Sequence, residues 1–136
     1  FLGTARDSIF AAMAKKILVG TDGSPTASRA VDRAVEVAQA SGAEMTIMAV
    51  GPRDEAERVV ASEASRHASS GVSIDSSTAS GEASRALVDR AKAGGYDMLV
   101  VGNRGMTGIA RFMRLGSVPN RVTHHLPCTL LIVKTS

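Results

Sequence analysis

Short apolar runs alternate with helical patterns along most of this chain, and that alternation constrains its fold more than any other feature. Five runs have the length and composition of buried or edge strands: residues 16–20, 44–50, 71–78, 97–102 and 128–133. The helical patterns between them cover residues 25–41, 54–69, 82–93 and a short segment that starts at Ser117. Strands that alternate with helices predict a parallel sheet covered on both faces. We therefore expect a Rossmann-like α/β fold with five parallel strands and four helices on both faces.

The first helical segment has the clearest boundaries. Ser24 is a suitable N-cap and Pro25 suits the first helical position, whereas Gly42 predicts the end of the helix. The inward face follows from the period of 3.6 residues: Val31, Ala34, Val35 and Ala38. The run at 97–102 is the most apolar of the five, so we expect it to be the most central strand.

Positive charge is concentrated in the last part of the sequence. Residues 1–97 contain 11 Lys and Arg against 13 Asp and Glu, whereas residues 98–136 contain five basic residues and no acid. An excess of this sign indicates an anionic partner. Only Phe112 is available there for stacking on bases. We therefore expect no nucleic-acid partner and favour a small phosphorylated ligand.

The length of 136 residues suits one domain. The single Cys128 excludes an internal disulfide and fits a reducing compartment. No apolar run approaches the ~20 residues of a membrane helix, so we expect a cytoplasmic protein without a membrane partner. Residues 1–14 belong to no clear periodic element, and we interpret them as an N-terminal extension or an artificial remnant.

The glycine-rich stretch VVGNRGMTGIARFMRLGSVPN is the main candidate for a binding loop. Gly102 and Gly105 follow an apolar strand and would let the backbone approach a ligand closely. Gly116 and Ser117 stand at the start of a helix, where free N–H groups and the helix dipole favour phosphate. The sequence therefore predicts phosphate binding here, with Arg104 either a further contact or a solvated surface residue.

A second special turn follows the first strand and runs from Gly20 through Thr21 and Asp22 to Ser24. In an open parallel sheet the ligand lies beyond the carboxyl ends of the strands, where the strand order reverses. If the first and fourth strands are neighbours there, this turn and the glycine-rich loop border one crevice. Asp22 would repel phosphate, so it suits ribose hydroxyls or a metal better. Its plainer alternative is a turn-forming residue or a helix N-cap.

Three segments together resemble the universal stress protein family. They are KKILVGTDGS at 15–24, DMLVVGNRGMTG at 97–108 and LGSVPNRVTHHLPCTLLIVK at 115–134, and the resemblance covers residues 15–136 as one universal stress protein domain. In the ATP-binding branch of this family the glycine signature is G-x2-G-x9-G-[ST]. Ten residues instead of nine separate Gly105 from Gly116 here. This departure affects the geometry of phosphate binding and leaves the expected fold unchanged.

The resemblance implies the strand order 3-2-1-4-5, a homodimer through the last strand at residues 128–134, and binding of ATP or a related adenine nucleotide, with or without Mg²⁺. By position, the nucleotide contacts that it implies are Asp22, Val50, Gly102, Gly105, Gly116, Ser117 and Val118. To these we add the turn residues Gly20, Thr21 and Arg104. Val50 would contact the adenine, and the short, polar segment 51–71 is expected to cover the adenine incompletely.

Other templates for nucleotide, metal or catalytic chemistry fit poorly. The chain contains neither G-x-x-x-x-G-K-[ST] nor G-x-G-x-x-G, and only Asp22 stands where a phospho-receiver domain needs paired acids. His124, His125 and Cys128 match no closed zinc site, and Cys128 suits packing better than nucleophilic attack. No catalytic constellation can be assembled, so we expect at most weak ATP hydrolysis. The favoured function is an ATP-binding stress-response or regulatory protein; the alternatives are a slow ATPase or phosphotransfer enzyme and a dimerisation module without nucleotide.

Overall fold

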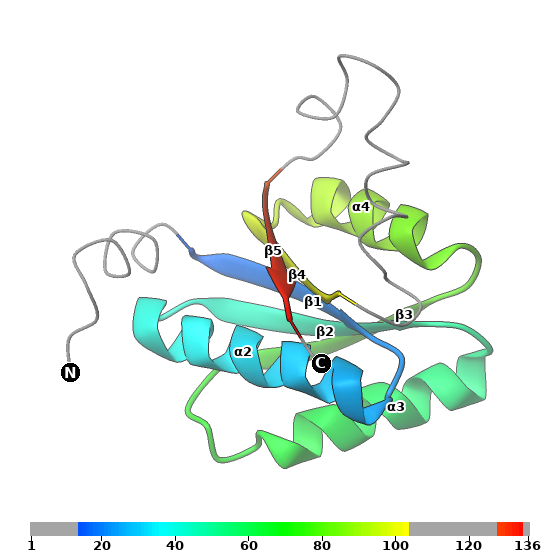
Figure 1. Cartoon of the computed structure of the whole chain (residues 1–136), viewed down its shortest axis with the longest axis horizontal. Coiled ribbons are helices and arrows are strands. Elements are labelled where there is room, and N and C mark those ends of the chain that lie inside the picture. Colours follow the sequence, from blue (N-terminus) through cyan, green and yellow to red (C-terminus); the bar gives the residue numbers. More distant parts are fainter. Residues whose placement is uncertain (1–13, 104–127, 135–136) are drawn as a thin grey trace.

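The computed structural model describes residues 14–103 and 128–134, which form one sheet with helices on both of its faces (Figure 1). The strands are β1 (Lys16–Thr21), β2 (Glu44–Val50), β3 (Ile74–Ala79), β4 (Met98–Gly102) and β5 (Thr129–Val133). The helices are α2 (Pro25–Ser41), α3 (Arg53–Arg66) and α4 (Ala83–Gly94). All neighbouring strands are parallel, in the order β3-β2-β1-β4-β5. This confirms the expected sheet and its order 3-2-1-4-5.

Two features differ from the expectation. The described residues contain three helices rather than four, because the helix expected from Ser117 falls in residues 104–127, outside the described ranges. The central strand is β1 and not β4. β1 and β4 both have a neighbouring strand on each side and are covered on both faces, so both are apolar. Hydropathy alone therefore does not show which of the two is the central strand. None of the described helices is long and apolar enough to cross a membrane.

Helix α2 begins and ends as its sequence predicts. The Ser24 hydroxyl accepts a hydrogen bond from the Ala27 N–H at 3.1 Å, and Pro25 opens the first turn. Gly42 follows the helix at a φ of 74°, the left-handed conformation that glycine adopts without strain. The buried residues confirm the predicted face and add one more: Ala30, Val31, Ala34, Val35 and Ala38.

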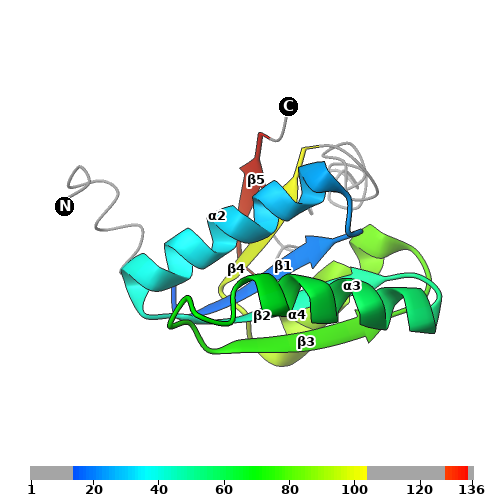
Figure 2. The same ribbon diagram turned by 90° about the horizontal axis from the view of Figure 1, so that it is seen from below.

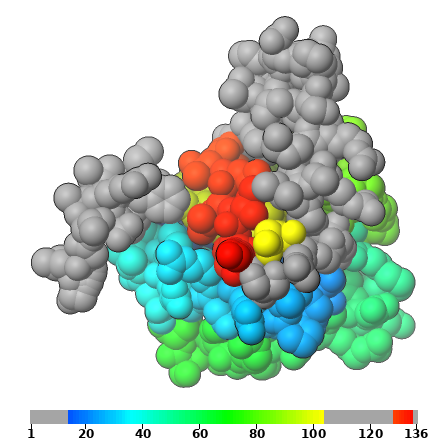
Figure 3. Space-filling model, viewed as in Figure 1, coloured from blue at the N-terminus to red at the C-terminus, as the bar shows by residue number. Residues whose placement is uncertain are grey.

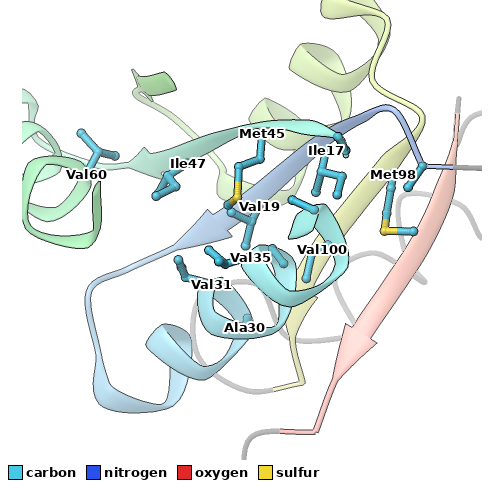
Figure 4. Packing of buried hydrophobic residues seen from close by; sticks show 14 of the residues in the cluster. Ile17, Val19, Ala30, Val31, Val35, Met45, Ile47, Val60, Met98 and Val100 are labelled. Atoms are coloured by element: carbon cyan, nitrogen blue, oxygen red, sulfur yellow. The ribbon is translucent and has the colours of Figure 1, made fainter. Parts of the chain in front are cut away.

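The sheet separates two apolar layers. One layer lies between the sheet and helices α2 and α3, where Ile17 and Val19 of β1 pack with Val31 of α2 (Figure 4). The other lies under α4 and contains Leu18 of β1. Figure 2 views the sheet from the side that α2 and α3 cover. Successive residues of a strand point to opposite faces, so the inner strands contribute to both layers. Ala14, the first described residue, is 2% exposed and belongs to the α2 layer.

A polar network joins α3 to α2. Glu63 is 4% exposed, and its carboxylate accepts hydrogen bonds from Ser28 Oγ at 2.5 Å and from Arg66 Nε at 3.0 Å. Arg66 Nη2 also lies 2.9 Å from Asp32 Oδ1, the oxygen that His67 Nε2 approaches at 2.9 Å. The hydrogen bond to Glu63 is the main cause that raises the pKa of Arg66. The network thus places a buried carboxylate between the two helices.

Candidate functional site

Strands β1 and β4 meet where the strand order reverses. From β1 the sheet continues through β2 and β3 on one side, and from β4 it continues to β5 on the other. The two strands pair in parallel with Val19 opposite Val100. β1 ends at Thr21 and β4 ends at Gly102, each two residues beyond this pair. The turn after β1 and the start of the glycine-rich loop therefore share one edge, at the position where doubly wound sheets bind ligands.

Asp22 has one carboxylate oxygen engaged in the turn and one available to a ligand. Its Oδ1 accepts a hydrogen bond from the Ser24 N–H at 2.9 Å, which forms an Asx turn. Its Oδ2 has no hydrogen-bond partner among the described residues, and the side chain is exposed. Thr21 differs, because it is 1% exposed and its Oγ1 accepts from the Gly23 N–H at 3.0 Å. The Thr21 side chain thus serves the turn, whereas Asp22 serves the turn and still presents an acceptor.

Gly20 makes room for helix α4. A Cβ at this position would lie 2.6 Å from Leu87 Cδ1, so Leu87 packs directly on the backbone of β1. Leu87 is completely buried. The structure therefore gives Gly20 a packing role near the carboxyl end of β1, and a backbone contact from Gly20 to a nucleotide stays a prediction.

Val50 ends β2, one strand away from β1. Its half-buried side chain packs against the apolar layer under α4. Beyond it a cavity of about 540 Å³ opens at the carboxyl ends of β2 and β3, lined by residues 51–53 and 78–81. This volume lies within the range of small-molecule sites. Only Gly51 and Pro52 connect β2 to α3, so this connection is too short to fold over the cavity.

The structure brings half of the predicted site residues to one edge of the sheet: Gly20, Thr21, Asp22, Val50 and Gly102. Gly102 is the buried last residue of β4. The other predicted contacts lie outside the described residues: Arg104, Gly105, Gly116, Ser117 and Val118. The phosphate side of the site therefore stays a prediction from the sequence.

One buried polar residue near this edge was not predicted from the sequence. Ser84, in the first turn of α4, is 0% exposed, and its hydroxyl has no hydrogen-bond partner in the described part of the chain. The available signal was its spacing of three residues from Leu87, which places both on one face of the helix. A buried hydroxyl without a partner is unusual in folded proteins and calls for an explanation.

Neither a metal cluster nor a reactive thiol occurs among the described residues. In these ranges no three or more His, Cys, Asp or Glu side chains gather in a group that could hold a metal ion. Cys128 packs half-buried against the layer under α4, and burial raises the pKa of its thiol to about 11. Such a thiol is protonated at neutral pH, so Cys128 behaves as a small apolar residue.

The sheet order defines a doubly wound α/β domain with its switch point between β1 and β4, the position at which such domains bind ligands. The sequence model of the Universal stress protein family matches residues 13–134. The chain therefore belongs to the universal stress protein family.

Known members of the family align with nearly all of the chain. Universal stress protein YxiE of Bacillus subtilis is 29% identical over 149 residues, which include 90% of this chain and 100% of that protein. A universal stress protein crystallised in complex with cAMP is 37% identical, with a TM-score of 0.72 over 90% of this chain and 98% of that one. A family protein from Arabidopsis thaliana with AMP bound is 19% identical, with a TM-score of 0.66 over 90% and 92% of the two chains. At that identity the likeness shows the fold alone.

Proposed function

We propose that the protein binds an adenine nucleotide, with ATP as the expected ligand, at the carboxyl edge of β1 and β4 and acts as a stress-response or regulatory module. The observation that carries this proposal is the available Oδ2 of Asp22 beside the switch point. A carboxylate in such a place suits the hydroxyls of a ribose. The complex of a 37% identical family member with cAMP supports the choice of an adenine nucleotide.

The parts of the nucleotide are assigned to different strand ends. Asp22 would accept hydrogen bonds from the ribose, and the base would lie against Val50 beside the 540 Å³ cavity. The phosphates would lie beyond Gly102, where the sequence proposes these further contacts: Arg104, Gly105, Gly116, Ser117 and Val118. Mg²⁺ would enter with the phosphates, because it keeps several waters and needs few protein ligands.

Titration calorimetry with ATP, AMP, cAMP and GTP tests this proposal, after any co-purified ligand has been identified by mass spectrometry and removed. We expect at least one adenine nucleotide to saturate one site per chain, and GTP to bind more weakly. Absence of binding by all three adenine nucleotides would contradict the proposal. Measuring the ADP that forms during incubation with ATP and Mg²⁺ distinguishes a binding module from a slow ATPase. A binding module should form ADP at the background rate, whereas a slow ATPase should form it faster.

We also propose a homodimer through β5. Among the described strands, β5 pairs with β4 alone and stands at the end of the sheet. Its last four residues are apolar and half-buried, and Figure 3 shows atoms of this strand at the surface in orange and red. An uncovered strand edge favours pairing with another strand, and a two-fold axis lets a second copy close it.

Ile132→Pro is expected to convert the dimer to a monomer, because proline removes a backbone donor from the free edge of β5. Thr129 N–H donates to Asp97 O and Val133 O accepts from Asn103 N–H, so the N–H of Ile132 faces away from β4 by strand alternation. Light scattering at micromolar concentration should give the mass of a dimer for the wild type and of a monomer for the variant. Ser76→Pro, at an outward N–H of the opposite edge strand β3, is the control and should leave the dimer intact. A monomeric wild type, or a dimeric Ile132→Pro with unchanged circular dichroism, would contradict the interface.

A further inference from the structure

We propose that Val59 of α3 is a positioning residue for the Asp22 carboxylate, a role that rests on the proposed function. Val59 is half-buried and packs against the apolar layer between the sheet and helices α2 and α3. It acts on the turn after β1 and makes no contact with the nucleotide itself. Its effect on binding passes through the backbone of Gly23, the residue next to Asp22.

The contact between Val59 and Gly23 is close. A Cβ at Gly23 would lie 2.9 Å from Val59 Cγ2 and 3.3 Å from Val59 Cγ1, so both methyl groups stand against the glycine backbone. Gly23 also has a φ of 82°, the left-handed conformation that glycine adopts without strain. Figure 1 shows α3 beside the loop that joins β1 to α2. Val59 therefore limits the space into which this turn can move.

The peptide groups on both sides of Gly23 donate the hydrogen bonds that shape the turn. The Gly23 N–H donates to Thr21 Oγ1 at 3.0 Å, and the Ser24 N–H donates to Asp22 Oδ1 at 2.9 Å. A displacement of Gly23 moves both donors and rotates the carboxylate, because Oδ1 follows the Ser24 N–H. The direction of Oδ2, the oxygen left for a ribose hydroxyl, therefore depends on the position of Gly23.

A second contact, one helical turn further along α3, keeps Val59 in place. Glu63 follows Val59 by four residues, so the two lie on the same face of the helix. The Glu63 carboxylate accepts a hydrogen bond from Ser28 Oγ at 2.5 Å, and the Ser28 N–H donates to Ser24 O at 3.0 Å. One face of α3 thus holds the turn through Val59 and the start of α2 through Glu63, and these two points fix the helix relative to the turn.

Val59→Ala should weaken the binding of ATP and of AMP by the same factor. The lost methyl groups leave room for the turn to move, so we expect a loss of about 3- to 10-fold, a part of what complete loss of the Asp22 contact would cost. Val59→Ile keeps both γ carbons and should bind as the wild type does. Val60→Ala is the matched control, because it removes the same groups from the next residue, which is 5% exposed in the same apolar layer. It should lose more stability than Val59→Ala and keep the wild-type affinity.

A double-mutant cycle shows whether Val59 acts through Asp22. Asp22→Asn no longer offers Oδ2 as an acceptor, so adding Val59→Ala to it should cost no further affinity. Titration calorimetry on the two single variants and the double variant measures this difference. A second loss of about 3- to 10-fold in the Asp22→Asn background would show that Val59 affects binding by another route, and would overturn the inference.

The remaining outcomes separate the role of Val59 from the proposed function. Equal affinities of Val59→Ala and wild type would overturn that role and leave nucleotide binding standing. The same holds if Val59→Ile binds as weakly as Val59→Ala, or if Val60→Ala loses as much affinity, since the general packing of α3 would then be the cause. A wild type that binds no adenine nucleotide would contradict the proposed function, and the role of Val59 with it.

Discussion

Replacing Asp22 by asparagine is expected to weaken adenine nucleotide binding by roughly 10- to 100-fold, the loss of a hydrogen bond to a charged acceptor. Asparagine retains a side-chain oxygen for the Ser24 N–H, so the turn after β1 should survive. The second carboxylate oxygen becomes an amino group, which cannot accept a hydrogen bond from a ribose hydroxyl. Titration calorimetry with ATP and AMP measures the loss.

Asp75→Asn is the matched control for this variant. The substitution removes the same charge, and Asp75 is exposed on the edge strand β3, away from the turn that holds Asp22. Both variants should unfold near the wild-type temperature, because substitutions at exposed positions rarely change stability much. If Asp22→Asn binds ATP as tightly as Asp75→Asn does, the Asp22 carboxylate makes no contact with the ligand, and the main support for the proposed function is lost.

A second large effect is expected on stability, from Arg66→Met. The change removes the cation that pairs with the buried Glu63 and keeps an unbranched side chain in its place. Removing one partner of a buried ion pair typically costs about 3–5 kcal/mol. Arg66 is 40% exposed and Ser28 still donates to Glu63, so we expect the free energy of unfolding to fall by about 2–3 kcal/mol. Denaturation by urea at neutral pH measures this difference.

Adding Glu63→Gln to Arg66→Met should recover most of the lost stability. The amide that replaces the carboxylate carries no charge, so it needs no cation, and it retains an acceptor for Ser28. Arg58→Met makes the same substitution at an exposed position of α3 and should stay within about 0.5 kcal/mol of the wild type. If the double variant loses the sum of the two single losses in unfolding free energy, the unpaired Glu63 carboxylate is not the cause of the destabilisation. The same conclusion follows if Arg58→Met loses as much stability as Arg66→Met.

The edge of the candidate site was predictable because it depends on strand ends. Asp22 follows an apolar run and Val50 ends another, and the carboxyl ends of parallel strands meet at one edge of a sheet. Gly102 was predictable for the same reason. The pairing of β1 with β4 was not predictable from the segments themselves, because strands about 80 residues apart leave no local sequence pattern. It was expected only from the family resemblance.

Two buried polar groups were not predictable from their segments. Ser84 looks like an ordinary helical serine, and its burial depends on α4 crossing β1 where Gly20 leaves room for Leu87. Glu63 looks like one of several acids of a polar helix. Its burial depends on α3 packing against α2, which brings Ser28 to the carboxylate. No pattern within α3 or α4 contains these contacts.

By itself, the sequence determined the alternation of strands and helices, the caps of α2 and its buried face. These features depend on residues within a few positions of one another, where the helical and strand periods and the capping residues act directly. Only the tertiary structure decided that β1 is the central strand and that the Thr21 side chain serves the turn while Asp22 keeps one oxygen available. It also decided that Ser84 is buried without a hydrogen-bond partner among residues 14–103 and 128–134. The physical reason is that burial and hydrogen-bond satisfaction are set by contacts between segments that are distant in the chain.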